Sequence, residues 1–309
     1  MAAALVGCEA PDEPPASLVA EASDDDSAVV SLLGDTLEFP EFDDETMARL
    51  RSDALEAAAN LEADPSAENF VWLGRRLAYL WRYERAIAVY TNGLSGFPDN
   101  AELYRHRGHR YVTMRRFSRA IADLRNAATL VEGTADVVER DGIPNEANLP
   151  RTTLQFNVHY HLGLAYYLVG DFERASGSFR DALDLARNDD ARVAATDWLY
   201  MSLRRNQRHN QAASLLDTIS PDMDILENDS YHRRLLMYKG MLPADSLLRP
   251  DTTDALAVAT QGYGVANWHL YNGRPDAADS LFRLIVDGDY WPAFGHIAAE
   301  AELARNASR

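Results

Sequence analysis

A chain of 309 residues is long for one globular core but ordinary for a stacked array, and 47% hydrophobic residues are ample for burial. The formal net charge of −18 argues against nucleic acid as a partner, because phosphate binding requires a positively charged face. A single cysteine excludes an intrachain disulfide and a thiolate metal site. No stretch of the sequence reaches the roughly 20 apolar residues that a membrane-spanning helix requires.

The N-terminal part of the chain differs from the rest in charge and composition. Residues 1–66 carry 17 acidic and 2 basic side chains. Within residues 1–42 we expect a signal remnant, an acidic tether that contains several prolines and, from residue 29, a more apolar extended segment. Acidic tails of this kind usually keep a chain solvated, so this charge indicates little about a partner.

Cys8 stands at the end of Leu5-Val6-Gly7-Cys8, directly before the polar run from Glu9 to Ser17. This arrangement resembles a bacterial lipobox, in which the cysteine is lipidated and becomes the new N-terminus. The resemblance implies a lipid-anchored protein of the bacterial cell envelope, attached to the membrane only through Cys8. Six apolar or small residues precede Cys8, fewer than the roughly 7–15 of a signal peptide, so a cytoplasmic protein is the alternative.

Residues 43–66 are expected to form an N-terminal helix. Apolar residues at helical spacing mark one face, namely Met47, Leu50, Ala54, Ala58 and Leu61. Asp43, Asp44 and Glu45 precede or open this helix, where negative charge suits the positive end of the helix dipole.

From residue 67 onward the chain repeats. Gly74 is followed twelve residues later by Ala86 and four residues after that by Tyr90. The same spacing recurs from two further glycines, in the sets Gly108–Ala120–Leu124 and Gly163–Ala175–Phe179. The first two glycines are 34 residues apart, and the next interval of 55 is one period plus a 21-residue insertion. At spacings of 37, 32 and 34 the pattern continues through Tyr200–Ala212–Leu216, His232–Ala244–Leu248 and Ala266–Ala278–Phe282.

Each unit is expected to be a pair of antiparallel helices, with the small Gly and Ala residues where the two backbones approach most closely. The large residue four positions after the Ala is expected to fill the gap against the next unit. Pro98 ends a second helix because it has no amide to donate, and Asn100 can cap the helix that follows. One hairpin cannot bury its apolar face alone, so the units are expected to stack.

The 34-residue period and the Gly–Ala–large pattern resemble the tetratricopeptide-repeat (TPR) family over about residues 67–292. The resemblance implies an all-α superhelix, an α-solenoid of stacked helix hairpins with no β-sheet. Units 1–2 occupy residues 67–134 and units 3–6 occupy residues 156–292, the unit near 225–258 being degenerate. Residues 293–309 are expected to form a C-terminal capping helix.

Residues 135–155 are interpreted as an insertion loop. Gly142, Pro144, Asn145 and Pro150 are residues typical of turns. The loop falls at the rim of the array, where an insertion can serve binding or act only as a spacer, and the sequence leaves both open.

The chain offers no catalytic or metal-binding pattern. His106 and His109 share one expected helix, and His159 and His161 another, but a zinc site needs three or four ligands and residues two apart do not share a helix face. Nucleophile-elbow and phosphate-loop motifs do not occur, and Gln261-Gly262-Tyr263-Gly264 lies at an expected helix start without a flanking strand. We therefore expect no enzyme, metal or cofactor.

The concave surface is the candidate binding site, because the TPR resemblance implies that the first helix of each unit lines a groove. Arg and Tyr are favoured at interfaces, since they combine contact area with directed hydrogen bonds. The candidate residues at groove positions are Arg75, Tyr79, Arg105, His109, Tyr160, Tyr167, Arg204, Tyr263, Asn267 and Tyr271.

We therefore expect a protein- or peptide-binding scaffold or adaptor. Residues 67–134 carry 11 arginines against 6 acids, and Arg75, Arg105 and Arg204 could each bind a carboxylate through two hydrogen bonds. Residues 29–42 carry acidic and aromatic side chains and are expected to occupy part of this groove in cis. The alternative is a small-molecule or glycan-binding lipoprotein, which a flat platform of stacked aromatic rings would favour.

Overall fold

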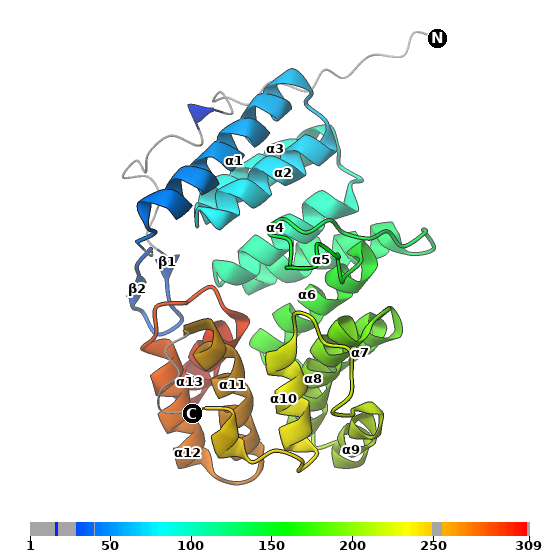
Figure 1. The fold of residues 1–309 in the computed structure, drawn as a ribbon, viewed down its shortest axis with the longest axis vertical. Coiled ribbons are helices and arrows are strands. Elements are labelled where there is room, and N and C mark those ends of the chain that lie inside the picture. The colour runs from blue at the N-terminus through cyan, green and yellow to red at the C-terminus, as the bar shows by residue number, and fades with distance from the viewer. Residues whose placement is uncertain (1–15, 18–28, 40, 249–254, 308–309) are drawn as a thin grey trace.

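The computed structural model describes residues 16–17, 29–39, 41–248 and 255–307, so Cys8 and most of the acidic tether lie outside the described residues. The expected all-α superhelix of stacked helix hairpins is confirmed. Figure 1 shows the N-terminal helices at one end of the long axis and the C-terminal helices at the other. Helix α1 (Asp44–Ala63) packs on the first hairpin, and Asp43 Oδ1 caps it by accepting from Thr46 N at 2.8 Å.

The first helices of the successive units contact one another along the inner side of the array. They are α2 (Ala67–Tyr79), α4 (Ala101–Thr113), α6 (Leu154–Leu168), α8 (Asp189–Arg205), α10 (Asp229–Tyr238) and α11 (Ala255–Tyr271).

The second helices pack on the first helices from outside. They are α3 (Tyr83–Gly96), α5 (Phe117–Val131), α7 (Phe172–Asp184), α9 (His209–Leu215), which continues as the 3₁₀ turn η2 (Leu216–Thr218), and α12 (Pro275–Val286). After α10 the chain forms only the 3₁₀ turn η3 (Ala244–Ser246) before the undescribed residues 249–254. Helix α13 (Phe294–Ala307) closes the chain and packs on α11, α12 and α6.

The glycine frame of the sequence marks close contacts between the two helices of one unit. A Cβ atom placed on Gly108 would lie 2.7 Å from Leu124 Cγ, and one placed on Gly163 would lie 2.8 Å from the Phe179 ring. Because glycine leaves room, the large side chain packs directly on the facing helix of its own hairpin. As expected, the large residue also reaches the next unit, since the Tyr90 ring stacks on His106 of α4 at 5.9 Å and the Phe179 ring on Trp198 of α8 at 6.1 Å.

A second periodic feature is a left-handed residue just after the first helix of a unit. Trp81, Arg115 and Gln207 have φ of 59°, 58° and 59°, although only glycine adopts this region without strain. Glycines take the equivalent place in three other units, with φ of 85°, 81° and 75° at Gly170, Gly240 and Gly273. This turn reverses the chain into the second half of each unit.

The expectation of no sheet is wrong in one place, because residues 29–37 form a small hairpin. Strands β1 (Val29–Val30) and β2 (Thr36–Leu37) pair antiparallel, with Val29 opposite Leu37. Leu32 N donates to Glu300 Oε2 at 3.1 Å, and Trp291 Nε1 donates to Glu38 O at 2.7 Å. In Figure 1 this hairpin lies beside the segment that leads into α13. It joins the two ends of the array.

The ends of α2 and α4 complete this closure. The Trp81 ring packs against the Trp291 ring with centroids 5.1 Å apart and planes at 82°. The Arg115 guanidinium is ion-paired with Glu300, and Arg115 Nη2 donates to Trp291 O at 3.1 Å. The left-handed residues after these two helices therefore contact the segment before α13. The superhelix is closed on itself and leaves an interior between its two halves.

Candidate functional site

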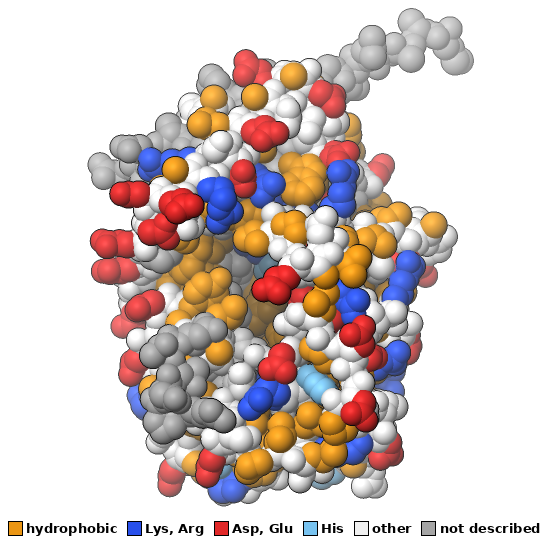
Figure 2. All heavy atoms as spheres, in the orientation of Figure 1, with side chains coloured by type: hydrophobic (Ala, Val, Ile, Leu, Met, Phe, Trp, Pro, Cys, Tyr) orange, Lys and Arg blue, Asp and Glu red, His pale blue; other side chains and the backbone are white. Residues whose placement is uncertain are grey.

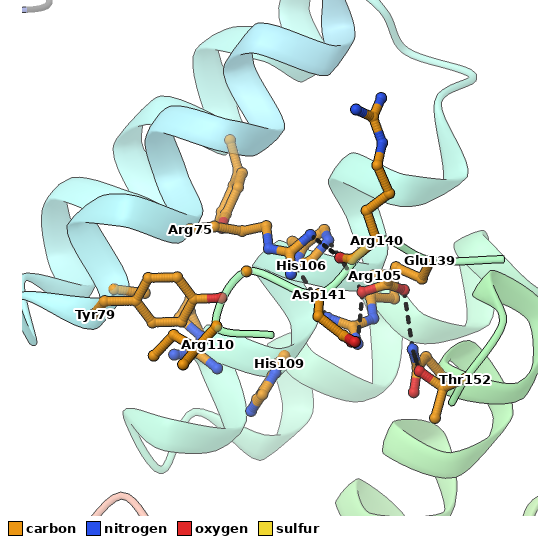
Figure 3. A pocket seen from close by; sticks show the side chains of 15 residues that line it. Arg75, Tyr79, Arg105, His106, His109, Arg110, Glu139, Arg140, Asp141 and Thr152 are labelled. Carbon is orange, nitrogen blue, oxygen red and sulfur yellow. Dashed lines mark hydrogen bonds and ion pairs between the residues drawn. The ribbon is translucent and has the colours of Figure 1, made fainter. Parts of the chain in front are cut away.

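The first two units present three arginines to a cavity on the inner side of the array. Arg75 comes from α2, and Arg105 and Arg110 come from α4. The cavity has a volume of about 280 Å³, and residues of the insertion loop form its opposite wall, as Figure 3 shows. We call this cavity the arginine pocket.

The insertion loop is bound to the wall of this pocket through its backbone. Arg75 Nη1 donates to the carbonyl oxygen of Arg140 at 2.8 Å, and Arg76 Nη1 donates to that of Gly142 at 2.9 Å. A side chain at Gly142 would collide with the Tyr79 hydroxyl. At the base of the loop Val138 and Thr153 form an antiparallel bridge. The loop is therefore docked on the first two units and forms part of the pocket wall.

Glu139 reaches from the loop to the floor of the arginine pocket. Its Oε1 lies 3.0 Å from Arg105 Nη2, and its Oε2 accepts from Asn157 Nδ2 at 3.1 Å. Arg105 Nη1 also lies 3.0 Å from His106 Nδ1. Arg105 is thus held in place by the protein itself, and its charge is balanced by a carboxylate of the same chain.

Arg75 and Arg110 are not balanced in this way. In the part of the chain that the structure describes, neither forms an ion pair with a carboxylate. The Arg110 guanidinium lies over the Tyr83 ring at 5.4 Å, and that of Arg75 over the Trp72 ring at 4.6 Å. Both cations face the cavity without an ion pair among the described residues.

The balance of charge in the pocket leaves one positive charge in excess. Figure 3 shows that the side chain of Arg140 points away from the cavity. Of the other lining residues, three are arginines and two, Glu139 and Asp141, are carboxylates. Asp141 Oδ2 is buried without a hydrogen-bond partner among the described residues, and burial raises the pKa of its carboxyl group. The pocket is suited to one additional carboxylate.

Three histidines lie around the pocket and are held neutral. Burial is the main cause that lowers the pKa values of His106, His109 and His161 well below 6.5, and the nearby Arg105 and Arg110 lower them further. The rings of His109 and His161 are 4.3 Å apart, and His109 also contacts Phe294 of α13 at 5.3 Å. Neutral imidazoles can each donate one hydrogen bond and accept another.

The sequence-predicted residues of the later units do not join this pocket. Tyr167, Tyr263 and Asn267 are fully buried, and the Tyr167 hydroxyl bonds with the Tyr263 hydroxyl at 2.9 Å and Asn267 Nδ2 at 2.8 Å. The Tyr160 hydroxyl lies 3.3 Å from that of Tyr231. Placing these residues on an open groove is therefore wrong, because α13 and the neighbouring helices seal them into a core.

Arg204 and Tyr271 lie together at a third place. The Arg204 guanidinium stacks over the Tyr271 ring at 4.3 Å, and Arg204 Nη2 donates to Asn272 Oδ1 at 3.0 Å. Arg204 does not line the arginine pocket, whereas Arg75, Tyr79, Arg105 and His109 do. Arg204 therefore does not belong to the expected carboxylate site with Arg75 and Arg105.

The extended segment 29–42 lies mostly outside the expected groove. Leu32 and Glu38 bond with Glu300 and Trp291, and Arg75 and Arg105 are contacted by the insertion loop. Only Phe42 packs on Trp81 and lines a cavity with Tyr79 and His109. A segment of the chain does supply an acid to the arginines in cis, but it is Glu139 of the insertion. Sequence reasoning chose the wrong segment because both are non-helical stretches that carry acidic side chains.

Sequence reasoning missed Arg110, His106 and Glu139. A signal was present in the run Arg105-His106-Arg107-Gly108-His109-Arg110, which places basic and imidazole groups around the glycine of closest helix approach. Helical spacing brings Arg105, His109 and Arg110 to neighbouring positions on α4, and all three line the pocket. For Glu139 the sequence carries no such signal, since loop docking depends on tertiary contacts.

Figure 2 shows the molecule hollowed between the N-terminal helices and the start of α11, with apolar side chains around the hollow. No helix of the described residues is long and apolar enough to cross a membrane. Within the same residues, no group of three or more His, Cys, Asp or Glu side chains is placed to hold a metal ion.

Comparisons with known proteins give similarity of fold alone. No family model and no curated protein matches the sequence. A similar solved structure is YrrB, described as a TPR protein with an unusual peptide-binding site, at 17% identity over 82% of this chain and 98% of that chain, with a TM-score of 0.43. A tetratricopeptide repeat protein from Parabacteroides merdae is 16% identical over 84% and 93% of the two chains, with a TM-score of 0.47. MamA of AMB-1 is 20% identical over 55% and 87%, with a TM-score of 0.41. From its own glycine frame and helix pairs, the chain has the fold of a tetratricopeptide-repeat superhelix.

Proposed function

We propose that this chain is a protein-binding scaffold whose arginine pocket holds a carboxylate of an extended partner segment. The observation that carries the proposal is the pair of cations, Arg75 and Arg110, that face the cavity without an ion pair among the described residues. A guanidinium group binds a carboxylate through two parallel hydrogen bonds, and neutral His109 adds a donor beside it. The proposal assigns the chain a binding role and no reaction.

The arrangement of the aromatic rings favours this proposal over a glycan ligand. Sugars stack on flat, exposed aromatic faces, but the rings beside the pocket meet edge to face. Trp81 meets Phe42 at 84° and Tyr290 at 83°, with ring centroids 6.5 and 5.6 Å apart. A hollow with arginines at one end suits an extended segment with a charged group better than a stacked sugar.

The test is affinity selection of random-sequence octapeptides on the folded protein, followed by anisotropy measurements on the selected peptides. We expect enrichment of Asp, Glu or a free C-terminus. The double variant Arg75→Ala with Arg110→Ala should weaken binding by about tenfold or more, since a hydrogen bond to a charged group contributes about 1.5–3 kcal/mol. The control is Arg125→Ala with Arg180→Ala, which removes the same charge from exposed positions on α5 and α7. Equal affinity of the two double variants would refute the proposal.

We also propose that Cys8 anchors the protein to a bacterial membrane. The lipobox-like sequence before the tether motivates this proposal. Expressed with its natural upstream sequence, the protein should fractionate with membranes, and Cys8→Ser should release it. Recovery of the cysteine-containing protein in the soluble fraction would favour the cytoplasmic alternative.

A further inference from the structure

A second cavity, of about 470 Å³, adjoins the arginine pocket. It lies between the start of α1, the ends of α2 and α4, and the segment before α13. Most side chains around it are aromatic or aliphatic, among them Phe42, Leu50, Trp81 and Pro292. We call it the apolar chamber. An apolar hollow of this size on a protein surface is typical of a ligand site.

The two cavities are adjacent and share wall residues. Tyr79, His109, Arg110 and Ile143 line both of them. Arg110 is one of the two cations without an ion pair among the described residues, so a carboxylate bound there stands at the boundary of the chamber. Any group attached next to that carboxylate meets either the insertion loop or the chamber.

The residues that form the chamber come from distant parts of the sequence. Ile143 belongs to the insertion loop, Phe42 precedes α1, and Tyr290 belongs to the segment that closes the superhelix. The edge-to-face contacts of Trp81 with Phe42 and Tyr290 hold these parts together. The chamber therefore exists because the superhelix is closed.

We propose that the apolar chamber takes a large apolar side chain that adjoins the carboxylate bound in the arginine pocket. The inference rests on the proposed function and specifies its ligand as an extended peptide in which leucine, isoleucine or phenylalanine carries or neighbours the carboxylate. Charge complementarity fixes the carboxylate at Arg110, and the mostly aromatic and aliphatic wall of the chamber beyond it suits an uncharged side chain.

The probes are four octapeptides with a label at the N-terminus and a common Gly-Ser sequence. Two end in leucine and two in serine, and each pair consists of a C-terminal free acid and a C-terminal amide. Burial of a leucine side chain corresponds to about ten- to hundredfold in Kd, so the leucine acid should bind at least about tenfold more tightly than the serine acid. Both amides should bind more weakly than their acids. The leucine–serine comparison needs no variant and is therefore independent of any folding defect.

A matched pair of loop variants locates the effect. Ile143 and Leu149 are both exposed on the insertion loop, at 62% and 53%, and Leu149 lines neither cavity. Ile143→Asn should reduce the leucine advantage by about threefold or more, while Leu149→Asn should leave it unchanged. Neither substitution introduces a charge that would repel the carboxylate.

The outcomes separate this inference from the proposed function. If the leucine and serine acids bind with equal affinity and each binds more tightly than its amide, the arginine pocket is supported and the chamber inference is refuted. If no acid is preferred over its amide, the proposed function fails and takes the inference with it. Decanoate serves as a competitor that tests the chemistry of the ligand further. If it displaces the labelled peptide at a lower concentration than unlabelled leucine acid does, the ligand is a small amphiphile and not a peptide.

Discussion

The two halves of the superhelix use equivalent inward-facing positions in opposite ways. On α2 and α4 the inward side chains border a cavity, and two of their arginines have no acidic partner among the described residues. On α8 and α10 two inward arginines are ion-paired with buried carboxylates. Arg234 lies 2.8 Å from Asp197 with both side chains inaccessible, and Arg205 lies 2.5 Å from Glu302 of α13.

The difference shows that a groove position does not define a binding residue. Helix α13 returns along the later units and supplies Glu302, which neutralises Arg205. At the early units the insertion loop supplies two acids, of which Glu139 is ion-paired with Arg105 and Asp141 forms no ion pair among the described residues. An arginine serves structure where a local acid reaches it and is available to a ligand where none does.

The largest expected effect comes from breaking a sealed ion pair. Arg234→Ala should destabilise the fold by about 3–5 kcal/mol, because it leaves the Asp197 carboxylate buried and unpaired. Arg110→Ala removes the same side chain from the pocket, where no ion pair is lost, and should change stability by less than about 1 kcal/mol. Urea unfolding of both variants measures the loss in the free energy of unfolding for each. Equal losses would mean that the two halves do not differ as described.

A smaller loss is expected where the open half is tightly packed. Gly108→Leu forces a side chain against Leu124 and should cost about 1–3 kcal/mol or more. Gly177 of α7 has no atom within 4 Å of an added Cβ, so Gly177→Leu is the matched control and should be neutral or slightly stabilising. Thermal melts compare the two. A melting temperature unchanged by Gly108→Leu would show that the helix frame is misplaced.

The smallest expected effect is a pH dependence that originates in the pocket half. The pKa values of His106, His109 and His161 lie below 6.5 in the folded protein, so the unfolded chain binds more protons as the pH falls through 6.5. Stability from these groups is present above 6.5 and is lost on acidification. The parent protein should lose more stability than His109→Gln between about pH 7.5 and about pH 5.5. Identical losses in the two proteins would contradict the assignment.

The sequence predicted the fold through local regularities and the site only in part. The glycines of the repeat lie where the two helices of a hairpin approach closely, as the sequence predicted. Their spacing also fixes which face of each helix points inward, and for this reason Arg75 and Arg105 line the pocket. The sealing of Tyr167 and Tyr263, and the loop docking through Glu139, could not be predicted. They depend on contacts between residues far apart in sequence, such as Arg115 with Glu300, which no periodicity encodes.

The central claim, that Arg110 holds a ligand carboxylate, is tested most directly by a double-mutant cycle between protein and peptide. A selected acidic peptide and its neutral amide are each titrated against the parent protein and against Arg110→Ala, which loses no intramolecular ion pair among the described residues. We expect a coupling free energy of about 1.5–3 kcal/mol for Arg110 and none for the exposed Arg125 of α5. A coupling of zero at Arg110, with the acid still bound more tightly than the amide, would contradict the account.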